Sequence, residues 1–172
     1  TIFVAFGSMP LAFTYPLMKR YTYWPQLFLG ITFNYGLILG WICIKDNLNI
    51  IPFVFYFGAI FWTLAYDTIY GFQDINDDEI IGLKSTSIKF KKNPYTFLTT
   101  CYLIFIFCTI ITGILMSFNY FFFIFLIIPL IHLILFQIKN LDVSDPNNCL
   151  RIFKSNNLFG LILFINILIG KL

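Results

Sequence analysis

Charge is what this sequence has least of. Asp, Glu, Lys and Arg together make up 11% of its 172 residues, whereas soluble domains carry roughly 25%. Hydrophobic residues make up 59%, and they include 23 Phe and 10 Tyr. A chain this short has too little interior to bury so many large apolar side chains. A soluble fold is therefore excluded, and we expect an all-α, polytopic transmembrane helix bundle.

Paired cysteines and a secretion signal are also missing. The four cysteines show no CxxC spacing, and three of them lie in apolar runs, where cysteine behaves as a small hydrophobic residue. We therefore expect neither a disulfide nor a zinc site from Cys43, Cys101, Cys108 and Cys149. The first residues contain no basic stretch followed by a cleavage site, and their pattern is that of the middle of a helix. We expect one transmembrane domain over residues 1–172, truncated at its N-terminus.

Long apolar runs are abundant, and they set the expected helices. A bilayer core about 30 Å thick needs roughly 20 apolar residues at 1.5 Å per residue. Residues 1–15 are too short for this and indicate part of a helix. Complete spans are predicted at residues 25–44, 50–72, 95–118, 120–138 and 156–172. We expect a tight turn at residues 117–119 and a kink at Pro129, which membrane helices tolerate.

The basic residues alternate between connections. Nine of the 11 Lys and Arg residues lie in the connections 15–24, 73–94 and 139–155, and the other two are Lys45 and Lys171. Cytoplasmic loops carry such an excess of Lys and Arg. The net charge of +3 therefore reflects topology and does not indicate nucleic-acid binding. We expect the three basic loops on the cytoplasmic or matrix side of a bacterial inner membrane or mitochondrial inner membrane, with the C-terminus on the other side.

One basic connection also holds most of the acids. Five of the eight acidic residues lie within residues 67–79. Asp74 and Asp78 are four apart and share a helix face, and Asp67 falls within roughly 20° of both, with Tyr70 one turn beyond it. Carboxylates this close repel one another unless a cation lies between them, and Mg²⁺ prefers such ligands together with substrate phosphates. The alternative is a solvated acidic loop, but Asp67 ends an apolar helix, where an acid is costly.

A second cluster lies at residues 14–26. Lys19 and Arg20 close the first apolar run, and Tyr15 lies four residues before Lys19 on the same face. These cations are either positive-inside anchors beside an interfacial aromatic belt or groups that bind a diphosphate, for which Arg offers bidentate bonds. Lys84, followed by Ser85 and a threonine, is a third cation that could donate to phosphate oxygens, although the glycine spacing of a P-loop is absent.

Few polar side chains interrupt the apolar runs. The single histidine, His132, is expected to have a polar partner on a neighbouring helix rather than a catalytic role. Asn34, Gln73 and Asn166 are expected to form hydrogen bonds between helices, and Asn34 is also placed to line a polar cavity.

The stretches YPLMKRYTYWPQLFLGITFNYGLILGW (15–41) and YDTIYGFQDINDDEIIGLKST (66–86) closely resemble the 4-hydroxybenzoate polyprenyltransferases of ubiquinone biosynthesis, in the UbiA superfamily of intramembrane aromatic prenyltransferases. The resemblance implies a fold of nine transmembrane helices around a central cavity, of which this chain would hold about helices 4–9. It also implies two aspartate-rich motifs. Asp74 and Asp78 would be the second motif, and the first, NxxxDxxxD, would lie before residue 1.

The resemblance further implies the roles of the site residues. Asp74 and Asp78 would bind Mg²⁺ and through it a polyprenyl diphosphate, and Asp67 matches an acid that precedes this motif. Tyr15, Lys19 and Arg20 match a segment that contacts the diphosphate or the aromatic acid. The implied reaction joins the prenyl group to the ring carbon next to the hydroxyl of 4-hydroxybenzoate. Other acceptors (homogentisate, dihydroxynaphthoate or haem B), a non-enzymatic fragment of a split gene, and a transporter are the alternatives.

Overall fold

The computed structural model describes residues 2–45 and 47–172, and most of them are helical. Its elements in chain order are α1 (Ile2–Thr14), η1 (Tyr15–Leu17), α2 (Met18–Tyr21), α3 (Pro25–Phe33), α4 (Tyr35–Lys45), α5 (Ile50–Gln73), α6 (Ile75–Ile80), α7 (Thr86–Lys89), α8 (Pro94–Leu115), α9 (Tyr120–Phe125), α10 (Ile127–Ile131), η2 (His132–Ile138), α11 (Pro146–Lys154) and α12 (Asn156–Lys171). The expected all-α fold is confirmed.

Five helical segments are long and apolar enough to cross a membrane: Pro25–Lys45, Ile50–Gln73, Pro94–Leu115, Tyr120–Ile138 and Pro146–Lys171. The expected polytopic bundle is therefore also confirmed. Four of these spans begin and end within three residues of the predicted ones. The tight turn expected at residues 117–119 is present, and Ser117 adopts a φ of 52° there.

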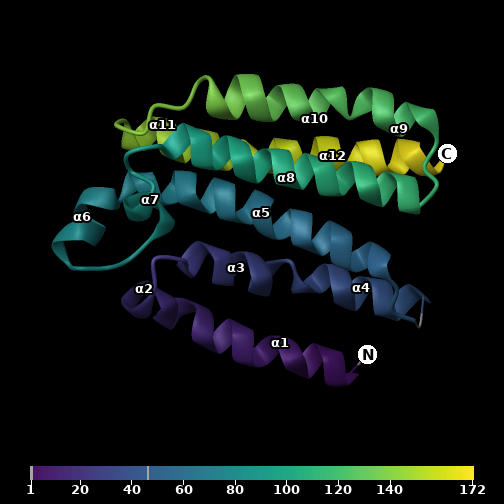
Figure 1. Cartoon of the computed structure of the whole chain (residues 1–172), viewed down its shortest axis with the longest axis horizontal. Coiled ribbons are helices and arrows are strands. Elements are labelled where there is room, and N and C mark those ends of the chain that lie inside the picture. Colours follow the sequence, from purple (N-terminus) through teal and green to yellow (C-terminus); the bar gives the residue numbers. More distant parts are fainter. Residues whose placement is uncertain (1, 46) are drawn as a thin grey trace.

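The helices lie side by side with their axes roughly aligned, and α5 is central (Figure 1). On one side α5 packs against α3 and α4, and on the other against α8 and α11. Gly58 of α5 lets α8 come close, because a Cβ at this position would lie 2.7 Å from the Cβ of Cys108. Small residues allow such close approach of membrane helices.

The connections sort to two ends of the bundle. The segments α2, α6, α7 and α11 gather at one end, which holds the three lysine- and arginine-rich connections and is called the basic end below (Figure 1). The N- and C-termini and the turn between α8 and α9 lie at the opposite end. The alternation of charge in the sequence therefore corresponds to the two ends of the folded bundle.

The start of the last span differs from the prediction. Helix begins at Pro146 rather than at residue 156, because α11 precedes α12 with only Ser155 between them. Asp145 caps α11 by accepting from the N–H of Asn147, and Pro146 occupies the first turn, where its missing N–H costs nothing. Charged and amide residues lower the hydropathy of α11, so the apolar runs of the sequence do not indicate this helix, although its residue Ile152 is fully buried.

The span Tyr120–Ile138 is irregular. Regular α-helix is interrupted at Leu126, three residues before Pro129, and the last two turns, η2, are π-helical. The N–H of Lys139 accordingly bonds the carbonyl of Ile134, five residues back, at 3.0 Å. Pro129 supplies no N–H to the preceding turn, and the kink expected there stays a prediction.

Polar side chains within the spans behave in two ways. Asn34 lies between α3 and α4, and its amide donates to Thr63 Oγ1 of α5 at 2.7 Å and to the Ala59 carbonyl at 3.2 Å, so the expected interhelical hydrogen bonds are confirmed. The expectation for His132 is wrong, since neither ring nitrogen has a hydrogen-bond partner within residues 2–45 and 47–172. Its ring packs on the rings of Phe136 and Phe159 instead.

Asn166 also departs from expectation. Its side chain is 2% exposed, and neither polar atom of its amide has a partner in the part of the chain that is described. Gln73 Oε1 is likewise without a partner there. Among the described residues, Asn34 is therefore the only one of the three amides that forms the predicted hydrogen bonds between helices. It does so because its neighbour on α5 is a threonine rather than an apolar side chain.

Candidate functional site

The basic cluster lies on the short segment that joins α1 to α3. The helix α1 ends at Thr14, the chain makes a tight turn at Tyr15–Leu17, and α2 adds one further turn. Lys19 and Arg20 both lie in α2 and are exposed. The chain then extends at Thr22, and Pro25 begins α3. This geometry leaves both cations at the basic end of the bundle.

The acidic cluster begins where α5 ends. Asp74 closes α5 with φ −111° and ψ 14° and is exposed, and the short helix α6 follows at once. Asp78 lies one turn later, with its N–H bonded to the Asp74 carbonyl at 2.9 Å. Its side chain is turned inward, and the residue is only 8% exposed. Asp74 and Asp78 therefore lie on successive turns, as the spacing predicts.

The predicted stripe of three carboxylates is not formed. It assumed one continuous helix from Asp67 to Asp78, but the backbone at Asp74 departs from helical geometry, and α6 projects away from the end of α5 (Figure 1). Within the described residues, no three His, Cys, Asp or Glu side chains are grouped closely enough to hold a metal ion. Asp67 is half-buried on α5, seven residues before the break at Asp74.

Lys19 joins the basic cluster to the acidic one. Its ammonium lies 3.9 Å from a carboxylate oxygen of Asp78. The Lys19 side chain remains 47% exposed, whereas that of Asp78 is 11% exposed. A cation of α2 therefore lies beside an acid of α6, and it keeps an open side toward solvent.

The third predicted cation belongs to the same site. The N–H of Lys84 donates to the Lys19 carbonyl at 2.8 Å, so the loop after α6 is hydrogen-bonded to α2 through the main chain. The Lys84 ammonium lies 3.4 Å from the Tyr21 carbonyl and 5.7 Å from the centre of the Tyr23 ring. Two segments about 65 residues apart in the sequence thus form one site.

Arg20 lines an open hollow beside this loop. The other residues of the hollow are Ile81, Gly82 and Leu83. Gly82 has a φ of 73°, a conformation that side chains disfavour, and the turn lets the N–H of Leu83 bond the Asp78 carbonyl at 2.9 Å. The loop therefore turns back over α6, and Arg20 of α2 lies exposed beside it.

The two predicted tyrosines lie at different places. Tyr15 is half-buried at the turn between α1 and α2. Tyr70 of α5 is 37% exposed, and its ring packs on Phe153 of α11 at 4.8 Å between centroids. Tyr70 therefore faces α11, on the far side of α5 from the contacts that α5 makes with α3.

Three buried polar residues of this region, Gln26, Thr68 and Ser87, were not predicted from the sequence. The threonine expected beside Lys84 as a donor to phosphate, Thr86, is buried with them. Gln26, Thr68, Thr86 and Ser87 are each 3% exposed or less. The side chain of Gln26 accepts from the N–H of Thr86 at 3.0 Å, and the hydroxyls of Thr68 and Thr86 are 2.6 Å apart. A polar residue directly after Trp-Pro at a helix start was the available signal, but only the fold reveals its partner.

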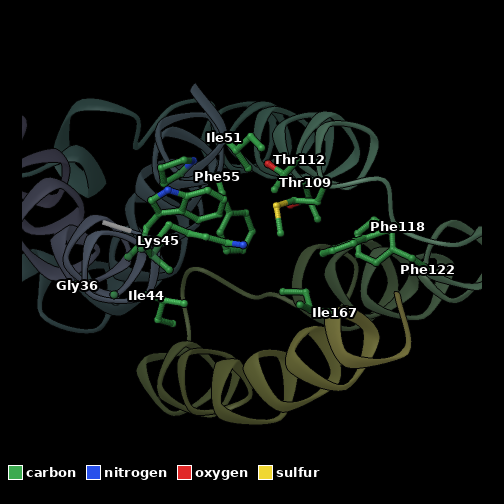
Figure 2. A pocket seen from close by; sticks show the side chains of 15 residues that line it. Gly36, Ile44, Lys45, Ile51, Phe55, Thr109, Thr112, Phe118, Phe122 and Ile167 are labelled. Carbon is green, nitrogen blue, oxygen red and sulfur yellow. The ribbon is translucent and has the colours of Figure 1, made fainter. Parts of the chain in front are cut away.

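An apolar hollow of about 430 Å³ lies toward the opposite end of the bundle. Figure 2 shows its walls, which come from α4, the start of α5, the end of α8 and the turn to α9, with Ile167 of α12 below. Gly36 and Gly40 line it, and a Cβ at either would meet nothing within 4 Å. The Lys45 side chain extends into the hollow from the end of α4.

The two carboxylates fit a magnesium ion as donors. Asp74 and Asp78 offer hard oxygen ligands on successive turns, and Mg²⁺ needs only one or two protein carboxylates when substrate phosphates complete its shell. Asp74 is exposed, and Asp78 lies beside the Lys19 ammonium, so one of the two carboxylates is next to a cation that would bind an anion.

The fold and the site define a polytopic membrane protein with joined acidic and basic clusters at one end of its helices. The chain belongs to the UbiA prenyltransferase family, which it matches over residues 1–168. This confirms the family inferred from the two quoted stretches.

The relatives that are similar to this chain have related names. The chain is 42% identical over 169 residues to the human protein "4-hydroxybenzoate polyprenyltransferase, mitochondrial", covering 96% of this chain and 45% of that protein. The bovine protein of the same name is 41% identical with the same coverage. "4-hydroxybenzoate geranyltransferase 2" of Lithospermum erythrorhizon is 39% identical over 173 residues, covering all of this chain and 56% of the relative.

The chain spans about half the length of the curated relatives it matches. No solved structure matches it.

Proposed function

We propose that the protein containing this chain transfers a polyprenyl group from a polyprenyl diphosphate to the ring carbon ortho to the hydroxyl of 4-hydroxybenzoate, as a step of ubiquinone biosynthesis. The observation that carries the proposal is the joining of Lys19, Lys84 and Asp78 in one site from distant parts of the chain. The relatives' names supply the acceptor and the class of donor.

The diphosphate of the donor is the group that this site suits. Lys19, Arg20 and Lys84 provide donors for its oxygens, and Arg20 offers two parallel bonds to one phosphate. Asp74 and Asp78 would hold Mg²⁺ between themselves and the diphosphate. When bound, the ion neutralises the charge that develops on the leaving group, which is a Lewis-acid role.

The reaction itself is an electrophilic aromatic substitution. The allylic carbon–oxygen bond breaks, and its electron pair leaves with the diphosphate, where the cations stabilise it. The allylic cation forms a carbon–carbon bond with the ring, which then releases a proton to regain aromaticity. We assign Tyr15 and Tyr70 to substrate binding, and Asp67 to the catalytic set with Asp74 and Asp78. An apolar surrounding excludes water, which would otherwise capture the cation.

We expect the end of the isoprenoid chain to bind in the apolar hollow. Phe55, which lines the hollow, lies 12 residues before Asp67 on α5, which corresponds to about 18 Å along the helix axis. A long isoprenoid chain whose diphosphate is at the basic end reaches that far, whereas a short one ends before it. We also propose that the basic end lies on the cytoplasmic or matrix side of the membrane, which its excess of Lys and Arg supports under the positive-inside rule.

The metal role is tested with two single substitutions in the full-length protein. We expect Asp74→Asn and Asp78→Asn each to abolish prenyl transfer while membrane insertion stays unchanged. Asp77→Asn is the matched control, because Asp77 is exposed on the same short helix and has no role in the proposal. Prenyl transfer is measured with 4-hydroxybenzoate, and in parallel with homogentisate, dihydroxynaphthoate and haem B. Normal turnover in either variant contradicts the metal role, and preference for another acceptor contradicts the assigned substrate.

A further inference from the structure

A buried polar junction connects three elements behind the charged site. It consists of Gln26 at the start of α3, Thr68 near the end of α5, and Thr86 and Ser87 of α7. Polar groups that are shielded from water must find partners within the protein, since an unpaired group costs free energy. Each member of this junction can therefore be traced to a specific partner.

The side chain of Gln26 bonds the main chain of α7. Its Oε1 accepts from the N–H of Thr86 at 3.0 Å, and Gln26 itself is 3% exposed. The N–H groups of a first helical turn have no partner inside their own helix. Ser85 Oγ accepts the N–H of Ile88 at 3.2 Å, so Gln26 supplies the other side-chain acceptor at this helix start.

The other bonds of the junction fix α7 on α5. The hydroxyls of Thr68 and Thr86 are 2.6 Å apart, and the hydroxyl of Ser87 donates to the Thr68 carbonyl at 2.8 Å. Gly71 completes the contact, because a Cβ at this position would overlap Ser87 Oγ and lie 3.4 Å from Gln26 Nε2. The loop is thus held between α3 and α5 with no spare room.

Only one residue, Ser85, separates this junction from the charged site. Thr86 follows Lys84 by two positions, and the N–H of Lys84 donates to the Lys19 carbonyl at 2.8 Å. Lys19 in turn lies 3.9 Å from Asp78. Within the described part of the chain, Gln26 forms no hydrogen bond with these charged groups, so any effect it has on them passes through Thr86 and the loop.

We infer that Gln26 is a positioning residue, which holds the Lys84 loop in the geometry that presents Lys19 and Lys84 together to the diphosphate of the donor. The inference rests on the proposed function for the identity of that anion. The clamp, by which we mean the hydrogen bond from the N–H of Thr86 to Gln26 that holds the loop, is a property of the fold and does not depend on the proposed function.

The test compares three substitutions of Gln26 in the full-length protein in lipid nanodiscs. Gln26→Leu removes the acceptor, Gln26→Asn keeps an amide but is one methylene too short to reach Thr86, and Gln26→Glu keeps an acceptor oxygen at the original distance. Hydrogen exchange of the peptide covering residues 83–88 reports the clamp, and the KM values for polyprenyl diphosphate and for the aromatic acid report positioning.

We expect Gln26→Leu and Gln26→Asn to speed exchange of residues 83–88 and to raise the KM for the diphosphate, each by about fivefold to tenfold, the effect of one lost buried hydrogen bond. The KM for the aromatic acid changes little, and Gln26→Glu restores both properties toward those of the parent protein. A purely structural role would instead speed exchange along α3 and α5 generally and leave both KM values unchanged for the folded fraction.

Three outcomes overturn the inference. Unchanged exchange at residues 83–88 in Gln26→Leu and Gln26→Asn shows that Gln26 does not hold the loop. Faster exchange with an unchanged KM for the diphosphate shows that the loop does not position the cations. Equal increases in both KM values show that the effect is not specific to the diphosphate. If the parent protein transfers no prenyl group, the proposed function fails and positioning fails with it, whereas the exchange measurement still decides the clamp.

Discussion

Replacing Asn156 with leucine removes the centre of a hydrogen-bond network that ties four helices together. Asn156 Oδ1 accepts from Trp62 Nε1 of α5 at 2.9 Å and from Gln137 Nε2 of η2 at 3.0 Å. The hydroxyl of Tyr102 on α8 donates to Gln137 Oε1. Leucine has nearly the shape of asparagine but no acceptor, so the indole N–H is left without its partner.

The expected loss follows from these two bonds. Interhelical hydrogen bonds in membrane proteins contribute about 0.6 kcal/mol on average and at most about 1.7. We therefore expect Asn156→Leu to lower the free energy of unfolding by about 1–3 kcal/mol. Asn157→Leu is the matched control, because Asn157 is the next residue of the same helix and is exposed. It should change stability by no more than about 0.5 kcal/mol.

Reversible unfolding by SDS in mixed micelles, followed by helical circular dichroism, measures both variants. Trp62→Phe, alone and combined with Asn156→Leu, completes a double-mutant cycle, since phenylalanine removes the N–H but keeps an aromatic ring against Phe159. A coupling energy near zero between these two sites, or equal destabilisation by Asn156→Leu and Asn157→Leu, would refute the reasoning.

Two glycines lead to further predictions. Gly58→Ala should destabilise the bundle by about 1–3 kcal/mol through overpacking, because its Cβ would lie 2.7 Å from that of Cys108. Gly40→Ala should be neutral or stabilising, since it meets nothing within 4 Å and alanine favours helix; the same SDS titration checks both, and equal destabilisation would contradict the packing. Gly40→Phe should fill the apolar hollow and lower kcat/KM for a long polyprenyl diphosphate about tenfold, as expected if two buried methylene groups are displaced, while geranyl diphosphate is unaffected. Steady-state kinetics of the full-length protein with the two donors measures this, and an equal loss with both would exclude the hollow as the place of the chain end.

The helices were predictable because hydropathy acts locally. Each span contains some 20 apolar residues, and lipid-facing side chains such as Phe107 and Ile114 remain exposed on the bundle, as a bilayer permits. The start of the last span was not predictable in this way. Its first turns are amphipathic, and burial of Cys149 and Ile152 is decided by α5, which lies far away in the sequence.

The candidate site was predictable in its residues but only partly in its geometry. The i, i+4 relation of Asp74 and Asp78 depends on one helical turn and is present. The placement of Asp67 on the same stripe required the helix to continue through Asp74, and it does not. The docking of Lys84 on Lys19 is a main-chain bond across about 65 residues, for which no side-chain pattern exists in the sequence.

The π-helical turns at the end of the span Tyr120–Ile138 hold one residue more than α-helix would over the same rise. Deletion of a single residue within them would return the segment to ordinary pitch and keep the residues on either side in register. Deletion of a residue earlier in the span would instead rotate all the following residues by roughly 100°, and Tyr102 and Asn156 would lose the amide of Gln137 that they share. The span therefore tolerates a lost residue at its π-helical end far better than in its regular part.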